Sequence, residues 1–102
     1  MQLTYPTALV LAALAARHGY GFRIADVTGL RVSTVYPILR RLEGEELVQS
    51  TWERDAQARA AARAARRIYR LTSAGQSAAV EALARYPGVA RQLGVRAGEA
   101  FS

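Results

Sequence analysis

Hydroxyl and guanidinium groups gather in one short stretch of the chain, residues 33–43, which reads STVYPILRRLE. Arg40 and Arg41 each carry a planar guanidinium, which matches phosphate oxygens and the edge of guanine. Ser33 and Thr34 add hydroxyl groups, and the phenol of Tyr36 can stack or contact a phosphate. These groups bind and orient a ligand, but they include no pair of nucleophile and base. The stretch is therefore typical of recognition rather than of catalysis.

The apolar residues of this stretch predict an amphipathic helix. At about 100° per residue, four aliphatic side chains fall on one face: Val35, Ile38, Leu39 and Leu42. The opposite face carries Ser33, Pro37, Arg40 and Gly44, with Tyr36 and Arg41 on its flanks. Ser33 or Thr34 is expected to cap the helix, which leaves Pro37 early enough to be tolerated. The outward face then carries hydroxyl and guanidinium groups and no bulky aliphatic side chain.

Each of these side chains also has a structural interpretation. Arg40 and Arg41 could form a solvated helix face, with Arg41 paired to Glu45 one turn further on. Tyr36 could anchor the helix against the preceding one. The placement of the stretch, after a turn and before a basic segment, favours DNA contact for the two arginines.

Composition points to nucleic acid as the first partner to test. The chain has 102 residues, enough for one domain, and a net charge of +6 with a pI near 10.8. All 14 basic residues are arginine. GC-rich coding could explain arginine in place of lysine, but not the excess of base over acid. With no cysteine and only His18 as histidine, the sequence predicts no cofactor, no metal site and no disulfide.

Residues 8–16 form an alanine- and leucine-rich run that resembles the apolar part of a signal peptide. No Lys or Arg precedes the run, and it is about half the length of a membrane span. We expect a buried helix and a cytoplasmic protein associated with the nucleoid, with no membrane partner.

The elements expected around residues 33–43 predict a winged helix-turn-helix of the mainly α (α+β) class. One helix is expected from about residue 6 to 17, and a second from 22 to 28 that ends at Gly29. The first is apolar nearly all round, so it is either central to the domain or shared with a second subunit. Residues 47–53 and 67–71 read as antiparallel strands, which form the wing.

The segment between the strands, residues 54–66, is rich in alanine and arginine and has no Gly or Pro turn signal. It is either a mobile loop or a nascent helix. From Arg54 to Arg70 six arginines and one aspartate give a local charge of +5. Four of them are candidates for phosphate contact: Arg59, Arg63, Arg66 and Arg67.

The domain is expected to cover residues 1–86, with a last helix at about 72–86. Residues 87–102 then form a short tail, in which residues 89–93 can add one turn.

Several motifs together resemble the PadR family of winged-helix transcriptional regulators, in its compact branch. They are His18-Gly-Tyr20, the stretch 33–43, Glu46-Leu-Val48, Trp52-Glu53, the segment 66–72, and Ala74-Gly75. Their order and spacing agree with the family over about residues 7–86. One departure concerns the wing, where alanines and arginines replace the Gly-x-Pro-type turn that is usual in the family.

The resemblance implies a homodimer that binds palindromic operator DNA as a repressor. It implies that the third helix enters the major groove and that the wing reaches the minor groove or the backbone. The first and last helices would form the dimer interface, for which the candidate residues are Leu9, Val10, Leu14, Val80 and Leu83. Many family members respond to small-molecule effectors, but no residue here can be assigned to one.

Two other functional classes are alternatives to a DNA-binding regulator. A winged helix can serve as a protein-interaction module, whose arginine-rich loop would contact an acidic partner. An enzyme is poorly supported, because the sequence has no phosphate-cradling glycine loop and no clustered carboxylates.

Overall fold

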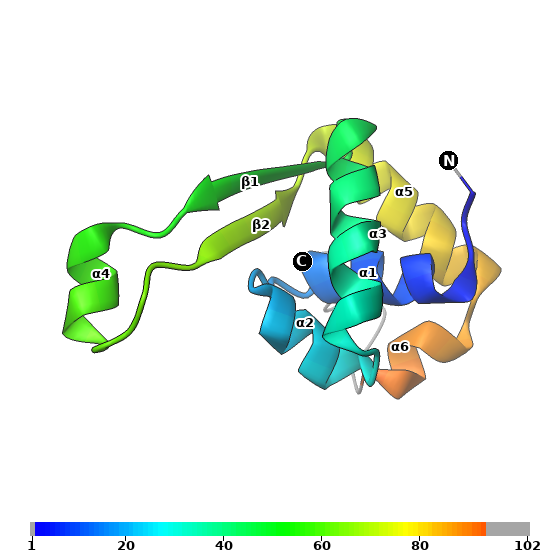
Figure 1. Ribbon diagram of the computed structural model, residues 1–102. Coiled ribbons are helices and arrows are strands. Elements are labelled where there is room, and N and C mark those ends of the chain that lie inside the picture. Colours follow the sequence, from blue (N-terminus) through cyan, green and yellow to red (C-terminus); the bar gives the residue numbers. More distant parts are fainter. Residues whose placement is uncertain (1, 94–102) are drawn as a thin grey trace.

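The computed structural model describes residues 2–93, and in it a helical body carries a projecting hairpin (Figure 1). The elements follow in the order α1 (Tyr5–Ala15), α2 (Gly21–Thr28), α3 (Val32–Gly44), β1 (Val48–Trp52), α4 (Asp55–Ala60), β2 (Arg67–Leu71), α5 (Ser73–Arg85) and α6 (Gly88–Gln92). In Figure 1 the hairpin extends to the left of the helices and α4 lies at its far end. The predicted winged helix-turn-helix is thus confirmed.

Helix α1 is the centre of the domain, which decides between the two interpretations of its apolar sequence. Thr4 Oγ1 caps it by accepting from the Thr7 N–H, and Pro6 lies in its first turn. From Thr7 to Leu14 every side chain is buried, and α2, α3, α5, α6 and β2 all pack around the helix. Leu9 and Leu11 are almost fully buried, and each such side chain contributes about 2 kcal/mol by leaving water.

The turn between α2 and α3 is short, so α3 begins earlier in the chain than predicted. Gly29 adopts the left-handed φ of 77° that ends α2, as predicted. The Thr34 and Val35 N–H groups then both donate to the Arg31 carbonyl, so α3 begins at Val32. The prediction that Ser33 or Thr34 caps α3 is wrong, because both lie inside the first helical turn. Pro37 lies inside the helix, and its missing N–H cannot donate to the Ser33 carbonyl.

The two strands pair antiparallel in a register that runs from Val48 opposite Leu71 to Trp52 opposite Arg67. Tyr69 is buried and Arg70 is exposed, as the predicted alternation requires. At the middle of β2 the Tyr69 N–H donates to the Gly19 carbonyl in the turn between α1 and α2 (2.8 Å). The segment between the strands, predicted as either a mobile loop or a nascent helix, contains the helix α4.

The last helices close the domain. Thr72 Oγ1 caps α5 by accepting from the Gly75 N–H (3.0 Å), in agreement with the predicted start of this helix. The turn expected at residues 89–93 is α6, and Val89 is completely buried in the core. Gln92 Nε2 donates to the Thr28 carbonyl at the end of α2 (2.8 Å). The rest of the expected tail, residues 94–102, lies outside the described residues.

None of the helices within residues 2–93 has the length and apolar character needed to cross a bilayer.

Candidate nucleic-acid interface

The exposed face of α3 presents the predicted reading residues to the outside. The four predicted aliphatic side chains of α3 are buried, which turns the opposite face away from the core. Ser33, Pro37 and Arg40 are exposed on that face, and Thr34 is partly exposed beside them. Within residues 2–93 the guanidinium of Arg40 forms neither a hydrogen bond nor an ion pair. Its five N–H donors are available to an external acceptor.

Arg41 lies on the flank of α3 and is partly held by the fold. Its Nη2 donates to Thr7 Oγ1 on the central helix (2.6 Å), and Thr4 Oγ1 also donates to that oxygen (3.0 Å). Thr7 is completely buried, so this bond satisfies a polar group inside the core. Arg41 therefore orients α3 against α1 and keeps only part of its guanidinium for other contacts.

Tyr36 anchors α3 on α2, as the structural interpretation proposed. Its ring meets Phe22 edge to face, with centroids 6.3 Å apart and an interplanar angle of 79°. Gly21 makes room for it, because a Cβ at that position would lie 2.4 Å from the Tyr36 hydroxyl oxygen. The ring is half-buried, so it holds the exposed face of α3 in place more than it extends that face.

An aromatic groove of about 400 Å³ separates α2 and α3 from the hairpin. Its lining includes Tyr20, Phe22, Tyr36, Trp52, Arg66 and Tyr69. Burial raises the pKa of Tyr69, the innermost of these rings. Phe22 and Trp52 remain 71% and 65% exposed, so the rim of the groove is open to solvent.

His18 lies half-buried in the turn between α1 and α2. Burial lowers its pKa, and the positive charge of Arg23 adds to the effect. Within residues 2–93 no three His, Asp or Glu side chains gather in a way that could hold a metal ion.

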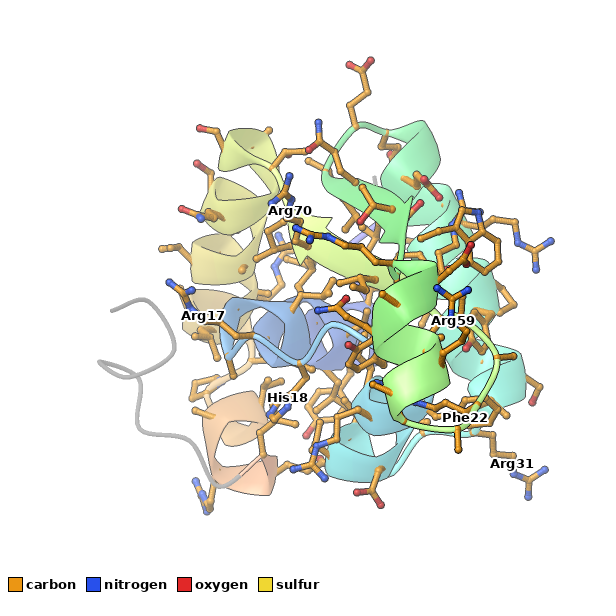
Figure 2. All side chains as sticks on the ribbon, turned by 90° about the vertical axis from the view of Figure 1, so that its left-hand side faces the viewer. Arg17, His18, Phe22, Arg31, Arg59 and Arg70 are labelled. Carbon is orange, nitrogen blue, oxygen red and sulfur yellow. The ribbon has the colours of Figure 1, made fainter. Side chains whose placement is uncertain are left out.

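The wing arginines fall into two groups, free and paired. Arg59 is exposed on α4 and forms no ion pair within the described part of the chain. Figure 2 looks onto this end of the molecule and labels Arg59 on the near helix. Arg54, which precedes α4, is also exposed. These two guanidiniums are therefore available at the tip of the wing.

Arg63 and Arg66 are paired with Glu53, a nearly buried carboxylate that follows β1. Arg63 donates through Nη1 to Oε1 and through Nη2 to Oε2, the latter at 2.8 Å. Arg66 Nη2 lies 3.5 Å from Oε2, and its guanidinium covers the ring of Tyr20 at 3.6 Å from the centroid. Tyr20 in turn donates to Glu53 Oε2 (3.4 Å). We call these four residues the Glu53 cluster.

The arginines hold the pKa of Glu53 low, at about 2. The hydrogen bonds from Arg63 are the largest cause, and the charges of Arg63 and Arg66 add to them. A carboxyl whose pKa is lowered by folding stabilises the fold above its ordinary value, here 4.5, and the contribution is lost as the pH falls through about 2.

An NMR titration of the Glu53 carboxyl should therefore give a midpoint near pH 2. Arg63→Ala removes the largest cause, so the midpoint should rise toward the ordinary value. A wild-type midpoint already at that value would mean that the cluster does not form in solution.

Arg67 joins the hairpin to α3. Its Nε donates to Ser50 Oγ (2.8 Å), and Ser50 Oγ donates to Glu43 Oε2 (2.5 Å). Arg67 Nη2 also lies 3.6 Å from that carboxylate oxygen, and its guanidinium lies 5.5 Å from the centroid of the Trp52 ring. Of the four wing arginines predicted for phosphate contact, only Arg59 is thus without a partner in residues 2–93.

The family model for PadR-like transcriptional regulators matches residues 9–81, from α1 through most of α5. The chain belongs to the PadR-like family. The match contains α3, the hairpin and the Glu53 cluster, so these are parts of a PadR domain. Comparison with curated proteins found no match.

Solved structures share the fold. A PadR family transcription regulator from Clostridium difficile has a TM-score of 0.61 at 20% identity, and the match covers 84% of this chain and 95% of that one. A PadR family regulator from Eggerthella lenta has a TM-score of 0.58 at 27% identity, with 84% and 78% covered. A MarR family transcriptional regulator from Silicibacter pomeroyi has a TM-score of 0.58 at 24% identity, and the match covers 88% of this chain and 59% of that one. The winged helix is therefore common to PadR and MarR-like regulators.

The candidate dimer residues of this PadR protein do not form one surface. Leu9, Val10 and Leu14 are at most 5% exposed, because α1 is covered by helices of its own chain. They cannot contact a second subunit directly, which corrects that part of the expectation. Val80 on α5 is 54% exposed and Leu83 is half-buried, so only these two remain near a surface.

Sequence reasoning missed Glu53, Tyr20 and Thr7 as residues that organise the interface. Glu53 carried a signal, since it is the last acid before the basic segment and is part of the Trp52-Glu53 motif. Its partners lie 10 and 13 residues further on and one comes from before α2, so no helical or strand spacing connects them.

Proposed function

We propose that this PadR-like protein is a sequence-specific DNA-binding regulator that acts in the cytoplasm as a dimeric repressor. The observation that carries the proposal is the outward face of α3. It combines the free guanidinium of Arg40 with hydroxyl groups, and it lies beside a wing whose tip carries Arg54 and Arg59. A helix of this kind can enter the major groove and read base edges.

The dimensions support the proposal. Helix α3 has 13 residues, and at 1.5 Å per residue it is about 20 Å long, which is ample for the major groove. The molecule measures 41 × 27 × 27 Å along its principal axes. The projecting hairpin of Figure 1 lets the wing reach phosphates beyond those that α3 meets.

Two-fold symmetry would complete the interface. A single reading helix contacts only a few base pairs, whereas a dimer reads two half-sites of a palindrome. Val80, on the outer face of α5, is one of the few large apolar side chains left exposed, which supports a subunit contact through this helix. An effector has no assigned residue in this proposal.

Selection of bound duplexes from a random pool tests the proposal directly. We expect palindromic sites whose half-site centres lie about 34 Å apart, one turn of B-DNA. The logarithm of the binding constant should fall linearly with the logarithm of salt concentration, by about 0.9 per phosphate contacted.

Binding without sequence preference, or a protein that is monomeric at micromolar concentration, would contradict the proposal. The first outcome would favour the alternative, a module whose exposed arginines Arg54 and Arg59 contact an acidic protein partner.

A further inference from the structure

We propose that Glu53 is the positioning residue of the wing. Its carboxylate holds Arg63 and Arg66 as parts of the fold and leaves phosphate contact to Arg54 and Arg59. The claim that Glu53 holds Arg63 and Arg66 is independent of the proposed function. The claim that Arg54 and Arg59 contact phosphate rests on the proposed function.

The Glu53 cluster lies where the two strands end and the wing loop begins. Trp52 opposite Arg67 is the last pair of the sheet, and the Glu53 N–H adds one more bond across it, to the Arg66 carbonyl (2.7 Å). The bidentate contact of Arg63 with the carboxylate then closes the loop from inside. A pair of this geometry fixes both distance and orientation, so it can replace a tight turn.

The tip of the wing beyond the cluster consists of α4 and the turn that follows it. It has no Gly or Pro, and Ala62 adopts a left-handed φ of 55°, a conformation that is unfavourable for a residue with a side chain. The Arg63 N–H donates to the Ala58 carbonyl and thereby stops α4, and the Ala58 side chain is buried. From this position the Arg63 side chain reaches back to the Glu53 carboxylate.

Tyr20 connects the Glu53 cluster to the helix-turn-helix. It lies in the turn between α1 and α2, under the guanidinium of Arg66, and it donates to the Glu53 carboxylate. The Nε of Arg66 is buried without a hydrogen-bond partner in the described residues, so the stacking on Tyr20 holds this side chain despite an unsatisfied donor. The wing is thus fixed relative to α2 and, through Tyr36, to α3.

The cluster also changes the charge that the wing presents. Two guanidiniums share one carboxylate, and Arg67 is paired with Glu43. The unpaired positive charge at the tip then comes from Arg54 and Arg59, beside the exposed Asp55, and not from all six arginines of residues 54–70.

Trypsin cleavage tests the claim about Glu53 without DNA. Trypsin cuts after arginine, and in the wild type the side chains of Arg63 and Arg66 are engaged. Glu53→Gln should raise cleavage after both by about tenfold, since proteolysis follows the population of the opened form. Cleavage after Arg41, which lies inside α3 directly before the fully buried Leu42, reports global unfolding and should stay unchanged. Glu53→Asp should give an intermediate rate after Arg63 and Arg66. Equal cleavage after Arg63 in wild type and Glu53→Gln would overturn the proposal.

The salt dependence of duplex binding tests the claim about phosphate. Arg59→Ala should reduce the slope of log binding constant against log salt by about 1, because one phosphate contact is lost. Arg63→Ala should weaken binding and leave the slope unchanged, because it disturbs the wing without removing a phosphate contact. An equal loss of slope in both variants would make Arg63 a phosphate ligand and overturn this claim. If the wild type binds no duplex, the proposed function fails, while the cleavage result still decides the role of Glu53.

Discussion

Replacing Gly75 by alanine should destabilise the protein by about 3 kcal/mol, at the upper end for an overpacked site. A Cβ at this position would lie 1.9 Å from the Leu47 carbonyl oxygen and 2.9 Å from its carbon. These are backbone atoms, so the clash cannot be relieved by a rotamer change. Either α5 or the connection from α3 to β1 must move, and Thr72 joins the two through bonds to the Leu47 and Glu46 carbonyls. Urea unfolding measures the loss.

Gly44→Ala is the matched control for that substitution. Gly44 is the last residue of α3, and a Cβ there would meet no atom within 4 Å. Alanine is the better helix former, so we expect this variant to be as stable as the wild type or more stable by roughly 0.5 kcal/mol. Equal destabilisation by both substitutions would show that the close approach of Gly75 to Leu47 is not the cause.

Arg40→Ala should lower the preference for the selected site over an unrelated duplex by about 1–3 kcal/mol, the range for a bidentate base contact. The free energy of unfolding should not change, because Arg40 is exposed and has no ion pair within residues 2–93. Titration of both duplexes by fluorescence anisotropy gives the two affinities.

Arg59→Ala distinguishes recognition of base sequence from electrostatic contact with phosphates. It should weaken both duplexes by the same factor, because a phosphate contact carries no sequence information. If Arg40→Ala also weakens both duplexes equally, Arg40 contacts backbone only, and the reading would have to come from other residues of α3.

Periodic patterns predicted the elements well, because each depends on its own residues. The aliphatic stripe of α3 and the alternation in β2 follow from spacings of 3.6 and 2 residues, and Gly29 ends α2 through its own φ. The start of α3 was missed because it depends on the length of the preceding turn. Both Ser33 and Thr34 have capping side chains, and a pattern alone does not say which residue comes first.

Pairing across the chain was not predictable in the same way. The sequence shows that the wing is basic, but not that Arg63 and Arg66 share the carboxylate of Glu53. Likewise, the apolar sequence of α1 has the same appearance whether its own chain or a partner covers it. Only the packing of α5 and α6 shows that Leu9 and Val10 belong to the core.

The hydrogen bond between Tyr69 and Gly19 limits how the hairpin can meet other chains. A two-stranded ribbon has two open edges, and each can act as a template for strand addition and aggregation. Here the turn between α1 and α2 occupies the outer edge of β2 at its centre. Only the outer edge of β1 remains, where Glu43 and Glu46 line the adjoining surface and their carboxylates disfavour a second strand. Strand addition is therefore confined to one edge, and that edge carries acidic neighbours.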